Sequence, residues 1–304
     1  MARSWFLLLA TALACTVLAA GAFGNPPSAS ATVTYPLDPS RDLPIPDRAY
    51  GSACVNHPAR DRCETIFVRA LNRGRETLAA PAYALPAHFH SLTGREQLLV
   101  LANLDRRLYG RGSILGLNAT LNASAERGAA SAVDPAFVPV GGQSLQSGAS
   151  NWAGGVHGAL FAYFVWMYAD GALGWEHRHN VLMQSPGDVL ILGIGSAASA
   201  SGYPSWTALL ESFAPSSLID CVPTVVLLSA RSGTDPGATT LRILGLGFVH
   251  VRRVTFGGVP AAFDRESAAA LLVTPPQHAP GKVRVQVVTR GGTSRLTAAA
   301  AYTY

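Results

Sequence analysis

The sequence lacks the short motifs that identify several common classes of enzyme and nucleic-acid-binding protein. It contains no Gly-x-Ser-x-Gly, His-Glu-x-x-His or Gly-x-x-x-x-Gly-Lys segment, the marks of serine hydrolases, zinc peptidases and phosphate-binding loops. The glycines of "LGIGSA" (residues 192–197) lack the third glycine of a dinucleotide-binding turn. No basic segment alternates with aromatic residues, as binding of single-stranded nucleic acid would require. These absences argue against those enzyme classes and against a nucleic-acid partner.

Long apolar runs are also scarce, and the clearest one lies at the N-terminus. Arg3 precedes an apolar run over residues 5–20, and the small residues 29–31 follow it. This order is typical of a secretory signal peptide over residues 1–31, and no later run of about 20 apolar residues predicts a transmembrane segment. We therefore expect a secreted protein that is extracellular or associated with the cell envelope. Lipidation at Cys15 is an alternative that this segment leaves open.

Few cysteines follow the predicted signal peptide: Cys54, Cys63 and Cys221. An exported protein meets an oxidising environment, where two cysteines this close in sequence favour a local disulfide. We interpret "CVNHPARDRC" as a disulfide loop between Cys54 and Cys63, with metal binding by this pair as the alternative. Cys221 is predicted to be a small buried residue or a free thiol near a domain boundary.

After the predicted signal peptide, net positive charge is confined to the C-terminal part of the chain. Residues 32–222 carry a net charge of −2, whereas residues 223–304 carry +6. A basic surface of this kind attracts anionic material such as wall polymers or lipid head groups. An anionic cell-envelope polymer is therefore one candidate partner, and a basic face that is merely solvated is the alternative.

The distribution of apolar residues predicts the organisation of the first 222 residues. Residues 32–62 are rich in proline and aspartate and predict an extended leader that contains the disulfide loop. Apolar residues at helical spacing predict helices over 63–76, 92–112, 117–132 and 155–171. Thr93 and Glu96 form a capping box at the start of the second helix. Two strands are expected after the helices, over 188–197 and 203–213.

From residue 223 onward, short apolar runs alternate with Gly/Pro turns. Between Val283 and Val287, valines alternate with polar residues, the period of two that a half-buried strand requires. Several such runs in about 80 residues predict a β-sandwich. The expected fold class is therefore α+β over residues 63–222, followed by an all-β immunoglobulin-like domain over residues 223–304.

Five segments of the first domain follow one another in a recognisable order: "LNRGRETLAAPAYALPAHFHSLTGREQLLVLANLDRRLYGR", "SNWAGG", "YFVWMYADG", "WEHRHNVL" and "LGIGSA". Together they make residues 63–214 similar to the CAP superfamily (cysteine-rich secretory, antigen and pathogenesis-related proteins), in its bacterial secreted branch. The resemblance implies an α-β-α sandwich around a central antiparallel sheet. It also implies an open cleft, where the family commonly presents two histidines and two acidic residues able to hold a divalent metal.

Only part of that cleft set is present in this sequence. "HRHNVL" matches the family segment, so the resemblance places His177 in the cleft. "SNWAGG" stands where the family usually has Gly-Glu-Asn, which puts Ser150 in the place of an acid and retains Asn151. No histidine lies near "VDPAFVP", where Asp134 is the nearest polar residue, and Asp170 is the candidate for the second acid. The predicted cleft residues are Asp134, Ser150, Asn151, Trp152, His157, Asp170, Glu176 and His177.

This reduced set does not favour a tight metal site, which needs three or four ligands that converge on one ion. His177 and His179 are two positions apart, so in an extended segment their side chains would point to opposite faces. We therefore expect no catalytic residue, no cofactor and no tightly bound metal, with His177 as the single candidate ligand for a divalent ion. The plainer role of His177, Arg178 and Asn180 is to hold the turn against the sheet.

A second set of ordered motifs lies in the C-terminal domain. It consists of Gly245, Gly247 and Phe248, then Phe256-Gly257-Gly258, Pro275-Pro276, Gly281 and Gly291-Gly292-Thr293-Ser294. This order is similar to that of IPT/TIG immunoglobulin-like domains. The resemblance implies a module that usually mediates contacts.

Three functions remain open at this point. The favoured hypothesis is a secreted, non-enzymatic binding protein, with a CAP-like cleft for a lipid-like or peptide ligand and an immunoglobulin-like module for surface or partner association. The first alternative is a secreted, metal-assisted hydrolase such as a peptidase, in which His177 polarises water beside Glu176 or Asp170. The second is a cell-envelope adhesin that binds through its basic C-terminal domain.

Overall fold

A computed structural model of the chain describes residues 34–46, 60–184, 187–200, 202–214, 219–233 and 240–304. The predicted signal peptide and Cys54 lie outside these residues, as does the side chain of Cys63, so the proposed disulfide falls outside the described part of the chain. Among the helices in the described residues, none combines the length and the apolar character needed to cross a membrane.

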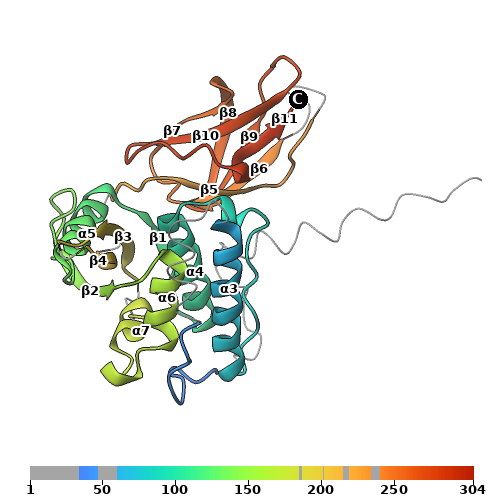
Figure 1. Ribbon diagram of the computed structural model, residues 1–304. Helices are drawn as coiled ribbons and strands as arrows, with labels where there is room; N and C mark the ends of the chain where they lie inside the picture. Colours follow the sequence, from blue (N-terminus) through green and yellow to red (C-terminus); the bar gives the residue numbers. More distant parts are fainter. Residues whose placement is uncertain (1–33, 47–59, 185–186, 201, 215–218, 234–239) are drawn as a thin grey trace, which may run out of the picture.

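A four-stranded sheet forms the middle layer of the N-terminal domain (Figure 1). Its order is β1-β3-β4-β2, built from β1 (Ile114–Leu117), β2 (Leu145–Gly154), β3 (Val189–Ala198) and β4 (Pro204–Phe213). β1 runs parallel to β3, and the remaining pairs are antiparallel. The sheet is thus mixed, which corrects the antiparallel sheet that the resemblance implied. Strands β1 and β2 also lie between the helices, where the sequence pattern placed none.

Helices cover both faces of this sheet, so the expected α-β-α sandwich is confirmed (Figure 1). α5 (Ala119–Ser131) packs on one face. The other face carries α4 (Gly94–Leu108) and α6 (Ala159–Tyr168), and α3 (Arg60–Thr77) packs against α6. The capping box of α4 is present, because Thr93 N–H donates to Glu96 Oε2 at 2.7 Å and Thr93 Oγ1 accepts the Glu96 backbone N–H. Three short helices complete the described helices of this domain: η1 (Phe89–Ser91), η2 (Gly171–Leu173) and α7 (Glu176–Val181).

The glycines of "LGIGSA" have a packing role. A Cβ atom on Gly193 would lie 2.4 Å from the Leu121 carbonyl carbon, and one on Gly195 would lie 2.1 Å from that of Ala125. Both glycines are on β3, and both contacts are with the backbone of α5. The missing side chains therefore let α5 lie directly against the sheet, which accounts for glycines in the middle of a buried strand.

Residues 223–304 form the expected all-β domain, in which every pair of hydrogen-bonded strands is antiparallel. The strand order is β11-β10-β7-β8-β9-β6-β5. The bounds are β5 (Thr224–Leu228), β6 (Leu241–Leu246), β7 (Val251–Phe256), β8 (Val259–Ser267), β9 (Ala270–Thr274), β10 (Lys282–Thr289) and β11 (Ala301–Thr303), with the short helix η3 (Ala298–Ala300) before β11.

The two domains pack against each other, because residues of the second domain complete the apolar core of the first. Val226 on β5 and Ala299 on η3 both belong to the large core cluster of the N-terminal domain. Cys221 lies at this boundary, fully buried and without a disulfide partner in the described residues, so both descriptions predicted for it are confirmed. The backbone joins the domains as well, since Gly247 N–H donates to the Leu115 carbonyl oxygen at 2.8 Å.

Candidate functional site

The segment "EHRHNV" forms the short helix α7, so the extended conformation expected for its two histidines is wrong. Trp175, directly before the helix, has a positive φ of 64°. The Asp170 carboxylate accepts the backbone N–H of His177 through Oδ2 at 2.8 Å. The first N–H groups of a helix have no partner within it. A carboxylate held by the preceding turn therefore favours helix here, a tertiary contact that sequence spacing did not reveal.

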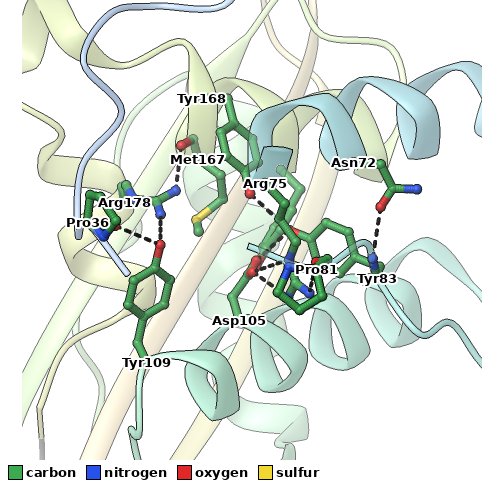
Figure 2. A network of polar contacts seen from close by, with 11 residues as sticks. Pro36, Asn72, Arg75, Pro81, Tyr83, Asp105, Tyr109, Met167, Tyr168 and Arg178 are labelled. Atoms are coloured by element: carbon green, nitrogen blue, oxygen red, sulfur yellow. Dashed lines mark hydrogen bonds and ion pairs between the residues drawn. The ribbon is translucent and has the colours of Figure 1, made fainter. Parts of the chain in front are cut away.

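Three residues of α7 hold the helix in place. Arg178 is fully buried and donates to the Met167 carbonyl oxygen at 2.8 Å and to the Tyr109 hydroxyl at 2.7 Å (Figure 2). His179 Nε2 lies 2.8 Å from Asp38 of the leader. Asn180 donates to the Ser150 carbonyl oxygen on β2 at 2.8 Å. These contacts tie the helix to the sheet, to α4 and α6, and to the leader.

His177 differs from these three, because it pairs with Asp170 at the edge of a cavity. Its Nδ1 lies 2.7 Å from Asp170 Oδ1, with the imidazole 18% exposed and the carboxylate 2% exposed. Asn151 fixes the backbone here by donating to the His177 carbonyl oxygen at 2.9 Å. Among the described residues, none forms a hydrogen bond with Nε2 of His177. A neutral imidazole that donates from Nδ1 to this carboxylate presents Nε2 as an acceptor.

The cavity has a volume of about 670 Å³. One wall is the end of β2 with the turn after it, another is one side of α6, and η2, α7 and the leader complete the lining. Its lining is mostly apolar, with polar groups concentrated at Asp170, His177 and His157. The lining residues are Ile45, Trp152, Ala153, Gly154, Gly155, Val156, His157, Phe161, Val165, Ala169, Asp170, Ala172, Leu173 and His177.

The structure brings four of the eight predicted cleft residues to this cavity: Trp152, His157, Asp170 and His177. The other four lie outside its lining. Asn151 is buried against the backbone of α7, Ser150 contributes its carbonyl oxygen to Asn180, and Glu176 and Asp134 are exposed.

The apolar lining on α6 was missed from the sequence. Phe161, Val165 and Ala169 follow one another at intervals of four and so share one side of the helix. A neighbouring side of the helix faces the core through Leu160 and Phe164. The sequence of α6 is apolar on all sides of the helix. This pattern indicates that more than one side of the helix is covered, and not only the side that faces the core.

The described residues do not form a metal centre. No group of three or more histidine, cysteine, aspartate or glutamate side chains gathers closely enough within them to hold an ion. His177 and Asp170 bond to each other rather than converging on a shared point. A divalent metal therefore does not fit the groups found at this cavity.

A second polar centre, far more deeply buried, lies among α3, α4 and α6. Asp105 accepts from Arg75 Nη2 at 2.7 Å and from the Tyr83 hydroxyl at 2.7 Å (Figure 2). It also accepts from the Tyr163 hydroxyl at 2.6 Å. Its exposure is 1%. Burial, and next the charge of Asp105, raise the pKa values of Tyr83 and Tyr163 well above their ordinary range. Both tyrosines therefore remain protonated donors, and Asp105 is a fully satisfied structural anion.

Comparison with known proteins identifies the C-terminal domain. A family model described as "IPT/TIG domain" matches residues 223–304. Residues 223–304 are an IPT/TIG domain. No curated protein matches this chain.

Several solved structures resemble parts of the chain. The "CAP domain of Enterococcal PrgA" is 12% identical, and the match covers 59% of this chain and 87% of that chain with a TM-score of 0.26. "SGBP-B from a complex xyloglucan utilization locus in Bacteroides uniformis" is 17% identical over 34% of this chain and 33% of that chain, with a TM-score of 0.24. The match thus spans about a third of the length of the Bacteroides protein.

Proposed function

We propose that the N-terminal domain is a non-enzymatic binding module whose cavity takes a lipid-like ligand carrying a hydroxyl group. The observation that carries this proposal is the apolar cavity with an imidazole at its edge, His177, which Asp170 orients and whose Nε2 no described residue engages. A volume of about 670 Å³ suits a small-molecule ligand. Apolar walls with a few polar groups that set orientation are the usual design of such sites.

The lining favours a lipid-like ligand over a peptide. A peptide brings an N–H and a C=O group with every residue, and each costs free energy when it is buried without a partner. The cavity offers few partners, because Trp152 Nε1 already donates to Ser205 and Asp170 is already bonded to His177. An alkyl chain has no such requirement. Its burial against Phe161, Val165 and Leu173 contributes about 25 cal/mol for each Å² of apolar surface removed from water.

A titration with a fluorescent long-chain alcohol tests the proposal. Leu173 lines the cavity and is 54% exposed, whereas Leu296 is 59% exposed in the other domain. We expect Leu173→Arg to weaken binding at least about tenfold, a loss of about 1.4 kcal/mol, because a charged side chain enters the apolar lining. The matched variant Leu296→Arg keeps the wild-type affinity. Equal affinity of all three proteins, or no saturable binding by the wild type, contradicts the proposal.

The hydroxyl is tested by comparing the alcohol with its methyl ether, which has the same chain but no donor. We expect wild type to prefer the alcohol by several-fold, since one hydrogen bond contributes about 0.5–1.5 kcal/mol. His177→Ala should bind the two ligands equally. A preference that persists in this variant would assign the hydroxyl contact to another group.

The His177–Asp170 pair also supports a second candidate, a hydrolase in which His177 acts as a general base on water. A base oriented by a carboxylate has the geometry for this role. The described cavity lining contains no serine, threonine or cysteine that could serve as a nucleophile. A screen with ester and peptide substrates tests this candidate: hydrolysis abolished by His177→Ala supports it, and activity that survives the substitution rules it out.

We propose export of the protein on the strength of its N-terminal segment, and a contact role for the IPT/TIG domain. Mass spectrometry of the protein recovered from culture medium tests the first point. A mature N-terminus at residue 32 supports export by the predicted signal, and retention of residues 1–31 contradicts it.

A further inference from the structure

The IPT/TIG domain gathers two cations at its border with the N-terminal domain. Thr303 on β11 pairs with Lys282 on β10, and its backbone N–H donates to the Arg231 carbonyl oxygen at 2.9 Å. Lys282 and Arg231 therefore flank the same residue on two sides. Arg231 Nη2 also donates to the Ala298 carbonyl oxygen of η3, which directs the guanidinium toward the domain boundary.

His88 adds a third basic group from the other domain. It stands at the N-terminus of η1, and η1 contacts η3 across the boundary. Burial, and then the charges of Arg231 and Lys282, lower the pKa of His88. The three basic groups are therefore close enough to act on one another, although they come from three separate segments.

The described residues do not neutralise this cluster. No carboxylate of the described chain forms an ion pair with Arg231 or Lys282, and none contributes to the shift of His88. Arg231 Nη1 is buried and has no hydrogen-bond partner among the described residues. A buried donor on a charged group costs free energy when it is left unpaired. Like charges held together add to that cost. An anion at this place would relieve both.

We infer that Arg231, Lys282 and His88 form a binding site for a phosphate-class oxyanion between the two domains. The guanidinium offers a fork of donors that matches phosphate oxygens, and the ammonium supplies a point charge. The site goes beyond the proposed lipid-binding cavity, which is lined by different residues. The site uses only a small part of the basic surface. We therefore expect anions to bind at this one place rather than to be attracted to the whole basic surface.

Lys282 makes the test direct, because it is the only lysine of the chain. Reductive methylation with ¹³C-formaldehyde keeps its charge and gives one side-chain NMR signal in the full protein. We expect inorganic phosphate to shift this signal with a saturable Kd of about 1 mM or tighter at 0.1 M salt. Dimethyl phosphate, a diester, tells whether a phosphodiester group is accepted as well as free phosphate. Neutral trimethyl phosphate should leave the signal unchanged.

Variants separate a site from general electrostatic attraction. Arg231→Gln should weaken phosphate binding at least about tenfold. Lys282→Gln changes an exposed residue and keeps the fold; the assigned His88 imidazole signals then report the same loss of affinity. Arg265→Gln is the control, since it removes one positive charge from exposed β8, two strands from β10. A non-saturable shift, or equal losses for all three variants, overturns the inference.

Discussion

The N-terminal domain holds two polar centres that differ in how completely they are paired. Asp105 receives hydrogen bonds from Arg75 and two tyrosines, and no part of this centre lines the cavity. Asp170 receives two from His177, but the imidazole keeps one nitrogen that no described residue engages. The first centre has no capacity left for a ligand. The second does, and it is the one at the cavity.

This difference separates stability from function within one fold. Buried charges are costly unless they are paired, so the Asp105 centre should matter most for folding. A group that keeps a free hydrogen-bonding position next to a cavity contributes less to folding and more to recognition. The substitutions that follow test this ranking through the free energy of unfolding.

Asp105→Asn should have the largest effect. It removes the charge that balances buried Arg75, and breaking a buried ion pair costs about 3–5 kcal/mol. Guanidinium unfolding followed by tryptophan fluorescence measures the change. The control is Glu126→Gln, which breaks the exposed pair with Arg95 and should cost at most about 1 kcal/mol. If both variants lost a similar amount of unfolding free energy, the structural role assigned to Asp105 would be wrong.

Asp170→Ala should have an intermediate effect of about 1–3 kcal/mol, because it leaves the His177 backbone N–H without its cap and the imidazole without its partner. The cavity lets water reach these groups, which limits the cost. The exposed Asp134→Ala serves as the control and should leave the free energy of unfolding nearly unchanged. A loss as large as that of Asp105→Asn would contradict the smaller structural role assigned to Asp170.

Glu211 is another buried acid, and its contribution to the free energy of unfolding should depend on pH. It accepts the Val138 N–H through Oε1, but its other carboxylate oxygen has no partner in the described part of the chain, and burial raises the pKa of the side chain. The folded state therefore holds the proton more tightly than the unfolded state. The contribution of Glu211 to stability is therefore greatest at low pH and falls as pH rises from the unfolded pKa through the raised folded pKa.

Replacing Glu211 by Gln removes this titration. We expect the unfolding free energy of the variant not to show the decrease that Glu211 causes between acidic and neutral pH. At pH 7 the variant should be more stable than wild type by about 1 kcal/mol. Unfolding free energies measured across this pH range provide the check. An unchanged pH dependence would place the titration elsewhere.

His177→Ala should have the smallest effect on folding, about 1 kcal/mol or less, since one hydrogen bond at a cavity edge is lost. The same variant should abolish the preference for an alcohol over its methyl ether. A large loss of stability with unchanged ligand preference would move His177 into the structural group with Arg178.

Much of the architecture was predictable from local patterns. Alternation along β10 and the capping box of α4 depend on neighbours in sequence, and both are confirmed. The helical form of "EHRHNV" was not predicted, because it depends on Asp170 reaching the His177 N–H. The resemblance pointed to Asp170 and His177, which meet at the cavity. It did not reveal Phe161 or Val165, nor the role of Asp105, which lies on the buried side of α4.

The most direct test is a crystal structure of the protein with a long-chain alcohol. We expect an alkyl chain between α6 and η2, with the hydroxyl about 2.7–3.2 Å from His177 Nε2. An alcohol bound elsewhere on the protein, or one in the cavity with its hydroxyl directed away from His177, would contradict this expectation.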